Sequence, residues 1–189
     1  MAGNKLEQLF TKFKEQAEAI SARVYRVHDS SAAGRQLENI IKELNIKKIT
    51  AAKSEMVSDC LKAVKSQDIV VHTSDLRQHA EDAELGLSEV DMAIAETGTL
   101  AQDSTALDQR LVSTLPPVHV ALVRIDRQVD KFVDAVDYFN EQDLMPGYIA
   151  FISGPSRTAD IERVLTIGVH GPEQLHIIFV DQAGGETCE

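Results

Sequence analysis

Arg157 follows an apolar, strand-like segment and a Ser-Gly-Pro turn in the run SGPSRTADIE. We predict that the chain enters a short helix over Thr158–Val164, with Ser156 or Thr158 as its N-cap. The unpaired N–H groups of a helix start and the planar guanidinium of Arg157 would together bind a carboxylate or phosphate. Alternatively, Ser156 and Thr158 only cap the helix, and Arg157 pairs with a surface carboxylate such as Asp160. The candidate ligand-binding residues are Gly154, Ser156, Arg157 and Thr158.

A second candidate is the segment ETGT, in which Glu96 ends an apolar run beside a glycine. A carboxylate at a strand end can act as a base or a nucleophile, or can hold a ligand. Gly98 permits a positive φ or a close approach of backbone to a ligand. The alternative is a bend between two strands with Glu96 in solvent. Glu96 is therefore a candidate catalytic residue, and Thr97, Gly98 and Thr99 are candidate ligand-binding residues.

A third candidate is the segment TIGVHGP, in which Gly168 and Gly171 flank His170. His170 could carry a proton or donate to a bound carboxylate, so Gly168 and His170 join the candidates. The alternative is a histidine hydrogen-bonded to backbone within a turn. His72 and His119, at the end of a strand and inside one, are expected to be structural. Of the two, His119 is the better candidate for a site, because Leu115-Pro116-Pro117 fixes its approach.

Composition excludes several classes of function. The chain has 189 residues, 43% of them hydrophobic, with a formal net charge of −11, which disfavours binding to nucleic acid or to an anionic membrane. The two cysteines form no CxxC and no cluster with histidine, so we expect no metal site. The start of the chain is too charged for a signal peptide, and no run approaches the ~20 apolar residues of a membrane span, which predicts a cytoplasmic protein.

The hydrophobic spacing predicts an α/β fold. A helix is expected from Leu6 to about Arg26 and another after Ser30, followed by alternating strands and helices. Strands are expected at 48–52, 68–72, 91–96, 99–102, 118–125, 148–153 and 175–181, and helices at 55–64, 76–85 and 130–144. Several strands are apolar throughout, which indicates a mixed, largely parallel sheet with helices on both faces. Ligands would then lie at the carboxyl ends of the parallel strands.

We expect three regions along the chain: an N-terminal helical arm (1–28), one α/β domain (29–183) and a flexible tail (184–189). The arm would either pack on the domain or join two copies of the chain. A homo-oligomer formed through this helix is thus one expectation.

Four segments together resemble the LUD-domain family, and within it the lactate-utilisation protein C branch. These four motif segments are Asp91–Leu100, Leu115–His119, Ser153–Glu162 and Leu165–Pro172. The resemblance spans about residues 35–182 and is most specific in the third and fourth segments. It implies a fold similar to the group of ribose-5-phosphate isomerase, glucosamine-6-phosphate deaminase and coenzyme A transferase. It also implies that the four segments line a common site.

For function, the resemblance implies a part in oxidising L-lactate to pyruvate within a system of three proteins. The partner subunits resemble iron–sulphur proteins, whereas this chain would bind no redox cofactor of its own. Our leading hypothesis is an accessory or ligand-binding subunit in which Ser156, Arg157 and Thr158 hold the carboxylate near Glu96 and His170. The alternatives are an independent enzyme acting on a sugar phosphate or a coenzyme A ester, with Glu96 as base or nucleophile, and a structural partner that assembles through its first helix.

Overall fold

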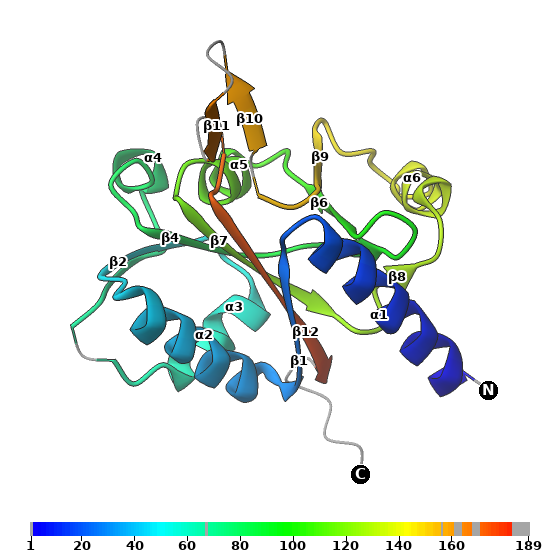
Figure 1. Ribbon diagram of the computed structural model, residues 1–189, viewed down its shortest axis with the longest axis horizontal. Helices are drawn as coiled ribbons and strands as arrows, with labels where there is room; N and C mark the ends of the chain where they lie inside the picture. The colour runs from blue at the N-terminus through cyan, green and yellow to red at the C-terminus, as the bar shows by residue number, and fades with distance from the viewer. Residues whose placement is uncertain (1, 67, 156, 161–163, 168–170, 183–189) are drawn as a thin grey trace.

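A six-stranded parallel sheet forms the centre of the molecule (Figure 1). The computed structural model describes residues 2–66, 68–155, 157–160, 164–167 and 171–182, and for 2–3, 157–160 and 164–167 it describes the backbone alone. The strand order is β1 (Arg23–Asp29), β12 (Gln174–Gln182), β7 (Val118–Arg124), β4 (Leu85–Glu89), β2 (Lys48–Ala51) and β3 (Val70–His72). Neighbouring strands of this sheet are paired in parallel throughout.

A smaller sheet and a hairpin accompany the parallel sheet. The smaller sheet has the order β8 (Gln128–Val129), β5 (Met92–Ile94), β6 (Thr99–Asp103) and β9 (Ile149–Ile152). β6 is antiparallel to both of its neighbours. β10 (Arg157–Asp160) and β11 (Val164–Ile167) form an antiparallel hairpin that projects from the body at the top of Figure 1.

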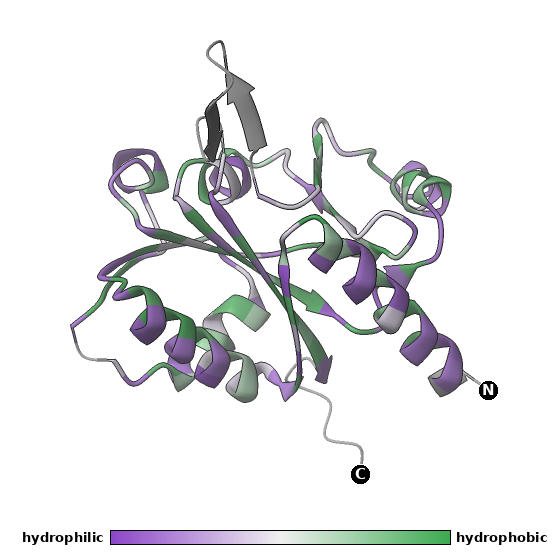
Figure 2. Cartoon of the chain, in the orientation of Figure 1, coloured by the Kyte–Doolittle hydropathy of each residue, from purple (hydrophilic) through white to green (hydrophobic). Residues whose placement is uncertain are grey.

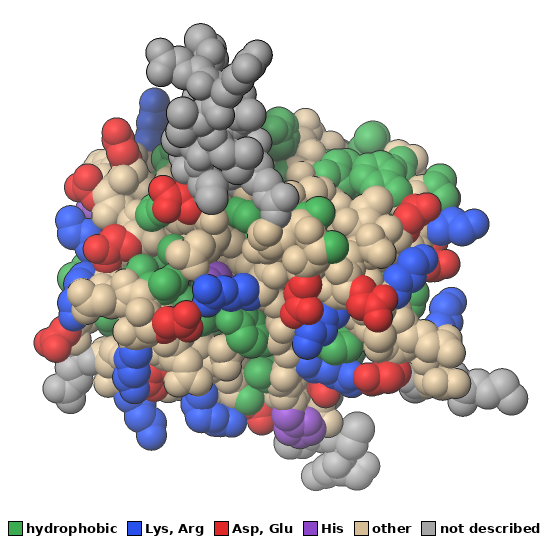
Figure 3. Space-filling model, viewed as in Figure 1, with side chains coloured by type: hydrophobic (Ala, Val, Ile, Leu, Met, Phe, Trp, Pro, Cys, Tyr) green, Lys and Arg blue, Asp and Glu red, His purple; other side chains and the backbone are tan. Residues whose placement is uncertain are grey.

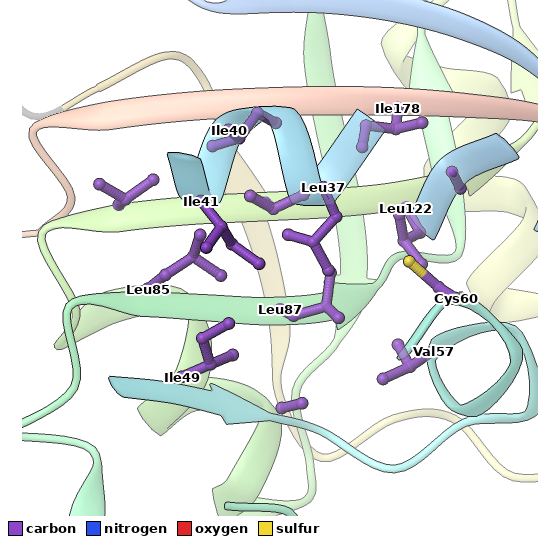
Figure 4. Packing of buried hydrophobic residues seen from close by; sticks show 14 of the residues in the cluster. Leu37, Ile40, Ile41, Ile49, Val57, Cys60, Leu85, Leu87, Leu122 and Ile178 are labelled. Carbon is purple, nitrogen blue, oxygen red and sulfur yellow. The ribbon is translucent and has the colours of Figure 1, made fainter. Parts of the chain in front are cut away.

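One face of the parallel sheet is covered by α2 (Ser30–Leu44) and α3 (Glu55–Ala63). The Asp29 side chain caps α2 by accepting from Ala32 N at 2.7 Å, and Asn45 ends the helix in the left-handed conformation. Residues spaced three and four apart, such as Leu37 and Ile41, point from α2 onto the sheet (Figure 4). They pack against Leu87, Leu122 and other fully buried strand residues, so this face is an apolar core.

The opposite face is covered by α1 (Ala2–Ala19), the smaller sheet and α5 (Leu107–Thr114). Phe13 of α1 is fully buried, and its ring meets that of Phe179 on β12 edge-on at 5.1 Å. The apolar stripe of α1 therefore faces the sheet, while hydrophilic residues cover much of its visible side (Figure 2). Two further helices, α4 (Leu76–His79) and α6 (Phe132–Asn140), complete the described elements.

The fold class predicted from the sequence is confirmed: the chain is a mixed α/β protein with a largely parallel sheet flanked by helices. Most of the expected strands and helices occur with their ends shifted by a few residues, and the bend at Thr97-Gly98 does join two strands. No described helix is long and apolar enough to cross a membrane.

Three local predictions were wrong. The first helix ends at Ala19 and not near Arg26, because Ser21 turns the chain with φ 71° and residues 23–29 continue as β1 within the range expected for the arm. The helix expected at 158–164 is instead the β10–β11 hairpin, whose second strand, VLTI, is rich in β-branched residues. The helix expected at 76–85 ends at His79, after which β4 begins at Leu85.

Candidate functional site

A pocket of about 490 Å³ is lined by residues of two of the four motif segments, Ser153–Glu162 and Leu165–Pro172, and by the two residues that precede Leu115–His119. No residue of the motif segment Asp91–Leu100 is in its described lining. Its described lining consists of hydroxyl, glycine and apolar residues: Ile20, Ser113, Thr114, Phe151, Ile152, Ser153, Gly154, Pro155, Gly171 and Pro172. Ile20, Thr114 and Pro172 each precede a strand of the parallel sheet. This motif pocket therefore lies at the amino ends of the parallel strands.

That position corrects an expectation. The segment Ser153–Glu162 was expected to follow a strand of the parallel sheet and thus to lie at its carboxyl edge. It follows β9 instead, which belongs to the smaller, mixed sheet, and it leads into the hairpin and not into a helix. The helix N-terminus that was expected to attract an anion beside Arg157 is absent from the described backbone at 157–160.

A hydrogen bond joins two of the motif segments directly. Thr99 begins β6 and is 3% exposed, and its hydroxyl lies 2.7 Å from the Ser153 hydroxyl at the end of β9. Either oxygen can be the donor, so one hydrogen of the pair remains available for another acceptor. Leu115–His119 joins the segment after Pro172 in turn, because Pro117 O accepts from Glu173 N at 2.8 Å and from Gln174 N at 3.1 Å.

Two glycines allow these loops to pack against the end of α1. Gly98 has φ +64° and Gly154 has φ +69°, which is the left-handed region that side chains disfavour. A Cβ on Gly98 would lie 2.3 Å from Ala17 N, and a Cβ on Gly154 would lie 2.6 Å from Ile20 O. The turn of ETGT and the turn of SGPS are therefore held against neighbouring residues of one helix end.

Not all of the predicted residues can be placed in this pocket. Ser156, Gly168 and His170 lie outside the described residues. Arg157 and Thr158 begin β10, two and three residues after Pro155 of the pocket lining, and only their backbone is described. Thr97 is exposed at the β5–β6 turn and is not among the lining residues.

The Glu96 side chain has a structural role in this fold. Its carboxylate accepts from Phe132 N at 2.9 Å, at the first residue of α6, and its side chain is exposed. A carboxylate in this position stabilises a helix start. The Phe132 ring in turn lies 4.6 Å from the ring of Phe151, which lines the motif pocket. Glu96 thus positions an aromatic pair beside the pocket without lining it.

Hydrophobic side chains gather over β9 and α6 next to this pocket, as the upper right of Figure 3 shows. The exposed apolar residues on and between these elements are Phe132, Val133, Leu144, Met145, Tyr148 and Phe151. A contiguous apolar patch on a protein surface commonly marks an interaction site.

The carboxyl edge of the sheet carries a different hollow, of about 330 Å³, that the sequence reasoning missed. Ser54, Glu89, Val90, Asp91, Asp103, Ala106 and Gln109 line it. After β2 the chain continues as α3 on one face of the parallel sheet, whereas after β4 it continues as β5 on the opposite face. The crevice between the carboxyl ends of β2 and β4 is therefore a topological switch point. Ligands of open α/β sheets favour such crevices.

Asp91 is the distinctive residue of this hollow. Burial raises the pKa of its carboxyl above the usual range, and the charge of Asp103 acts in the same direction. Its Oδ2 atom accepts from Asp103 N at 2.6 Å. The residue opens the motif segment Asp91–Leu100, two positions after the end of β4, and this position could have identified it had β4 been predicted.

A buried polar network lies behind this hollow, beneath α5. The Gln102 amide donates to Ser88 Oγ at 3.2 Å and to Gln109 Oε1 at 3.0 Å. Ser88 Oγ lies 2.9 Å from Nε2 of His119, which is fully buried. Burial lowers the pKa of His119 to about 4, so the ring is neutral at pH 7, which fits the structural role expected for it. The described residues contain no group of three or more side chains able to hold a metal ion.

The comparisons with known proteins identify the family. The LUD domain matches residues 10–180. The chain therefore belongs to the LUD-domain family, as its four motif segments indicated.

Among curated proteins, the chain is similar to lactate utilization protein C 1 of Bacillus mycoides (strain KBAB4), with 30% identity over 189 residues that cover 93% of this chain and 80% of that protein. It is 39% identical over 106 residues to lactate utilization protein C of Geobacillus sp. (strain WCH70), covering 54% of this chain and 44% of that protein. For lactate utilization protein C of Macrococcus caseolyticus the identity is 38% over 108 residues, covering 55% and 47%. The matches to these last two proteins span less than half of their length.

A solved structure shows the same fold. The crystal structure of a DUF162 family protein from Deinococcus radiodurans matches with a TM-score of 0.67 at 20% identity, covering 93% of this chain and 98% of that one. This likeness extends over nearly the whole of both chains.

Proposed function

We propose that this protein is a component of an L-lactate utilisation system that binds a small carboxylate in the motif pocket and carries no redox cofactor of its own. The observation that carries the proposal is a pocket lined by residues 113–114, 151–155 and 171–172, to which the segment 98–99 is joined by the hydrogen bond between Thr99 and Ser153. The relatives named lactate utilization protein C support the metabolic role.

The chemistry of the lining supports an anionic ligand. The described lining residues include no Asp or Glu, although the chain as a whole has a net charge of −11. The Thr99–Ser153 hydroxyl pair has one hydrogen left to donate, and hydroxyl groups hydrogen-bond readily to carboxylates. Arg157, two residues beyond Pro155, supplies a guanidinium within the same segment.

The partners follow from the same proposal. Lactate oxidation needs an electron acceptor, which iron–sulphur subunits would supply. The apolar patch over β9 and α6 supports a partner subunit beside the motif pocket, because Phe151 belongs to both.

Thermal denaturation with L-lactate, D-lactate, pyruvate and phosphate tests the proposal. A ligand present at about a hundred times its dissociation constant stabilises the fold by about 2.7 kcal/mol, which raises the melting temperature by about 5–10 °C for a chain of this size. We expect L-lactate or pyruvate to produce this rise in the parent protein and not in Arg157→Ala.

The matched control is Arg35→Ala, an exposed arginine on α2 across the sheet from the pocket. It should respond to the ligand as the parent does. An equal rise in the parent and in Arg157→Ala would show that Arg157 does not hold the carboxylate, and no rise with L-lactate or pyruvate would contradict binding by this chain.

A second candidate function rests on Asp91. A partly buried carboxyl with a raised pKa, placed in a hollow at a topological switch point, is a typical general acid or base. This observation favours acid–base catalysis by an independent enzyme, with Asp91 in the role that the sequence had suggested for Glu96. The candidate substrate classes, a sugar phosphate or a coenzyme A ester, are those that the resemblance to the fold group implies.

A further inference from the structure

A groove of about 720 Å³ between α3 and β3 belongs to neither of the hollows described above, although it shares Ser54 with the carboxyl-edge hollow. β3 is an edge strand of the parallel sheet, so the groove opens along the border of the molecule. Its lining consists of Ala52, Lys53, Ser54, Val57, Ser58, Leu61, Lys62, Val64, Ser66, Ile69, Val71 and Thr73.

Part of the wall of this groove is apolar. Val57 is buried, whereas Leu61, Val64, Ile69 and Val71 are half-buried and pack against the large core beneath α2 and α3. Side chains that are half-buried at a groove wall retain apolar surface that a ligand can cover. A cavity of this size with mostly apolar walls suits a small organic molecule.

The charged groups of the groove are cationic. The lining contains two lysines and no carboxylate, in a chain with 30 acidic and 19 basic residues. Lys62 is paired with Asp59 at 2.7 Å. Lys53 forms no ion pair with any residue that the structure describes, so its ammonium can bind an anion.

The polar groups free to bind a ligand and the larger apolar side chains lie at different ends of the groove, although Lys62, which is paired with Asp59, and Ser66 also line the apolar end. Lys53, Ser54 and Thr73 follow β2 and β3 and so lie together at the carboxyl edge. Leu61, Val64 and Ile69 lie at the opposite end, at the close of α3 and before β3. Ser54 Oγ accepts from Val57 N at 3.1 Å as the cap of α3, which leaves its own O–H to donate.

We propose that this groove binds an amphipathic monocarboxylate, a medium-chain carboxylic acid. The carboxylate lies on Lys53 Nζ and the Ser54 hydroxyl, and the hydrocarbon chain runs along Val57, Leu61 and Val71 toward the end of α3. A single available ammonium matches a single negative charge, and the apolar wall matches the chain. This inference is independent of the lactate role, because the groove and the motif pocket share no lining residue.

Isothermal titration calorimetry with butanoate, hexanoate and octanoate tests the proposal. Each buried methylene should tighten binding about fourfold, since it contributes about 0.8 kcal/mol. Lys53→Gln should weaken all three acids by about tenfold or more, because it removes a charge-assisted contact. Leu61→Phe should narrow the far end and so weaken octanoate far more than butanoate.

The matched control is Lys65→Gln, an exposed lysine just after α3 that does not line the groove; it should bind octanoate as the parent does. Octylammonium should bind at least tenfold more weakly than octanoate. Equal binding of the two, an affinity that does not change with chain length, or an equal loss in Lys65→Gln would each overturn the proposal. The rise in melting temperature with L-lactate should be the same in Lys53→Gln as in the parent. A failure of the proposal for this groove would therefore leave the proposal for the motif pocket standing, and the reverse also holds.

Discussion

The two edges of the parallel sheet are built in different ways. At the amino edge, glycine turns press against the end of α1, and the described lining of the motif pocket is uncharged. At the carboxyl edge, Glu89, Asp91 and Asp103 line one hollow, and Lys53 lines the near end of the groove beside it. The amino edge thus depends on close backbone packing, and the carboxyl edge on the placement of charges, so substitutions at the two edges should have different consequences.

The sharpest test of this difference is catalytic. If the carboxyl edge performs acid–base chemistry, the isolated chain should turn over a sugar phosphate or a coenzyme A ester, and Asp91→Asn should reduce the rate by about 10²- to 10⁴-fold. Steady-state assays on a panel of both substrate classes measure this. Glu96→Gln is the comparison variant, because Glu96 caps α6 away from the hollow and should keep most of the rate. Absence of turnover across the panel would argue against the independent enzyme.

At the amino edge the expected loss is in stability. Gly98→Ala should lower the free energy of unfolding by about 3 kcal/mol, because the new Cβ adds left-handed strain to a clash with the backbone of α1. For a chain of this size the melting temperature should fall by about 6–12 °C, which calorimetry measures.

Gly147→Ala is the matched control, because its Cβ would lie 3.6 Å from Thr105 Cγ2, an ordinary contact. The free energy of unfolding should change by no more than about 0.5 kcal/mol. A similar loss of unfolding free energy in both glycine variants would show that the close approach of Gly98 to α1 does not account for the effect.

The smallest expected effect concerns the polar network between the edges. The folded-state pKa of His119 is about 4, below its unfolded value of about 6.5, so the unfolded chain binds the extra proton and stability falls as the pH drops through this window. At pH 5 the loss from this one residue should be about 2 kcal/mol.

Urea denaturation at pH 7 and pH 5 measures this loss. His119→Gln should show a smaller difference between the two pH values than the parent, whereas exposed His28→Gln should match the parent. An unchanged difference in His119→Gln would show that another group accounts for the loss in acid.

Local patterns in the sequence were sufficient for the fold class and for most elements. Apolar strands such as Val118–Arg124 and the stripe Leu37, Ile40 and Ile41 indicate their own structure, because the period of hydrophobicity reports what each segment must bury. The β5–β6 bend was predicted for the same reason, together with the freedom that Gly98 gives the turn.

What could not be predicted depends on pairing between distant residues. β1 reads RVYRVHD, an edge strand with charges at every third position, and only its pairing with β12 defines it. The assignment of β9 to the smaller sheet rests on its pairing with β6, and this assignment moves the third motif segment from one edge of the parallel sheet to the other. Asp91 was missed as a site residue because its burial depends on Asp103 and its neighbours across two sheets.

The position of β1 also has a consequence for the order of folding. Arg23 pairs with His176, so β1 cannot join the sheet until residues near the far end of this sequence have been synthesised and have reached β7. The half made of β2, α3, β3 and β4 closes over short stretches of chain, whereas β1, β12 and the helix α1 packed upon them close over nearly the whole of it. Because loops of such length close slowly, the motif pocket, which needs Ile20 and Pro172 together, should be among the last parts of the protein to form.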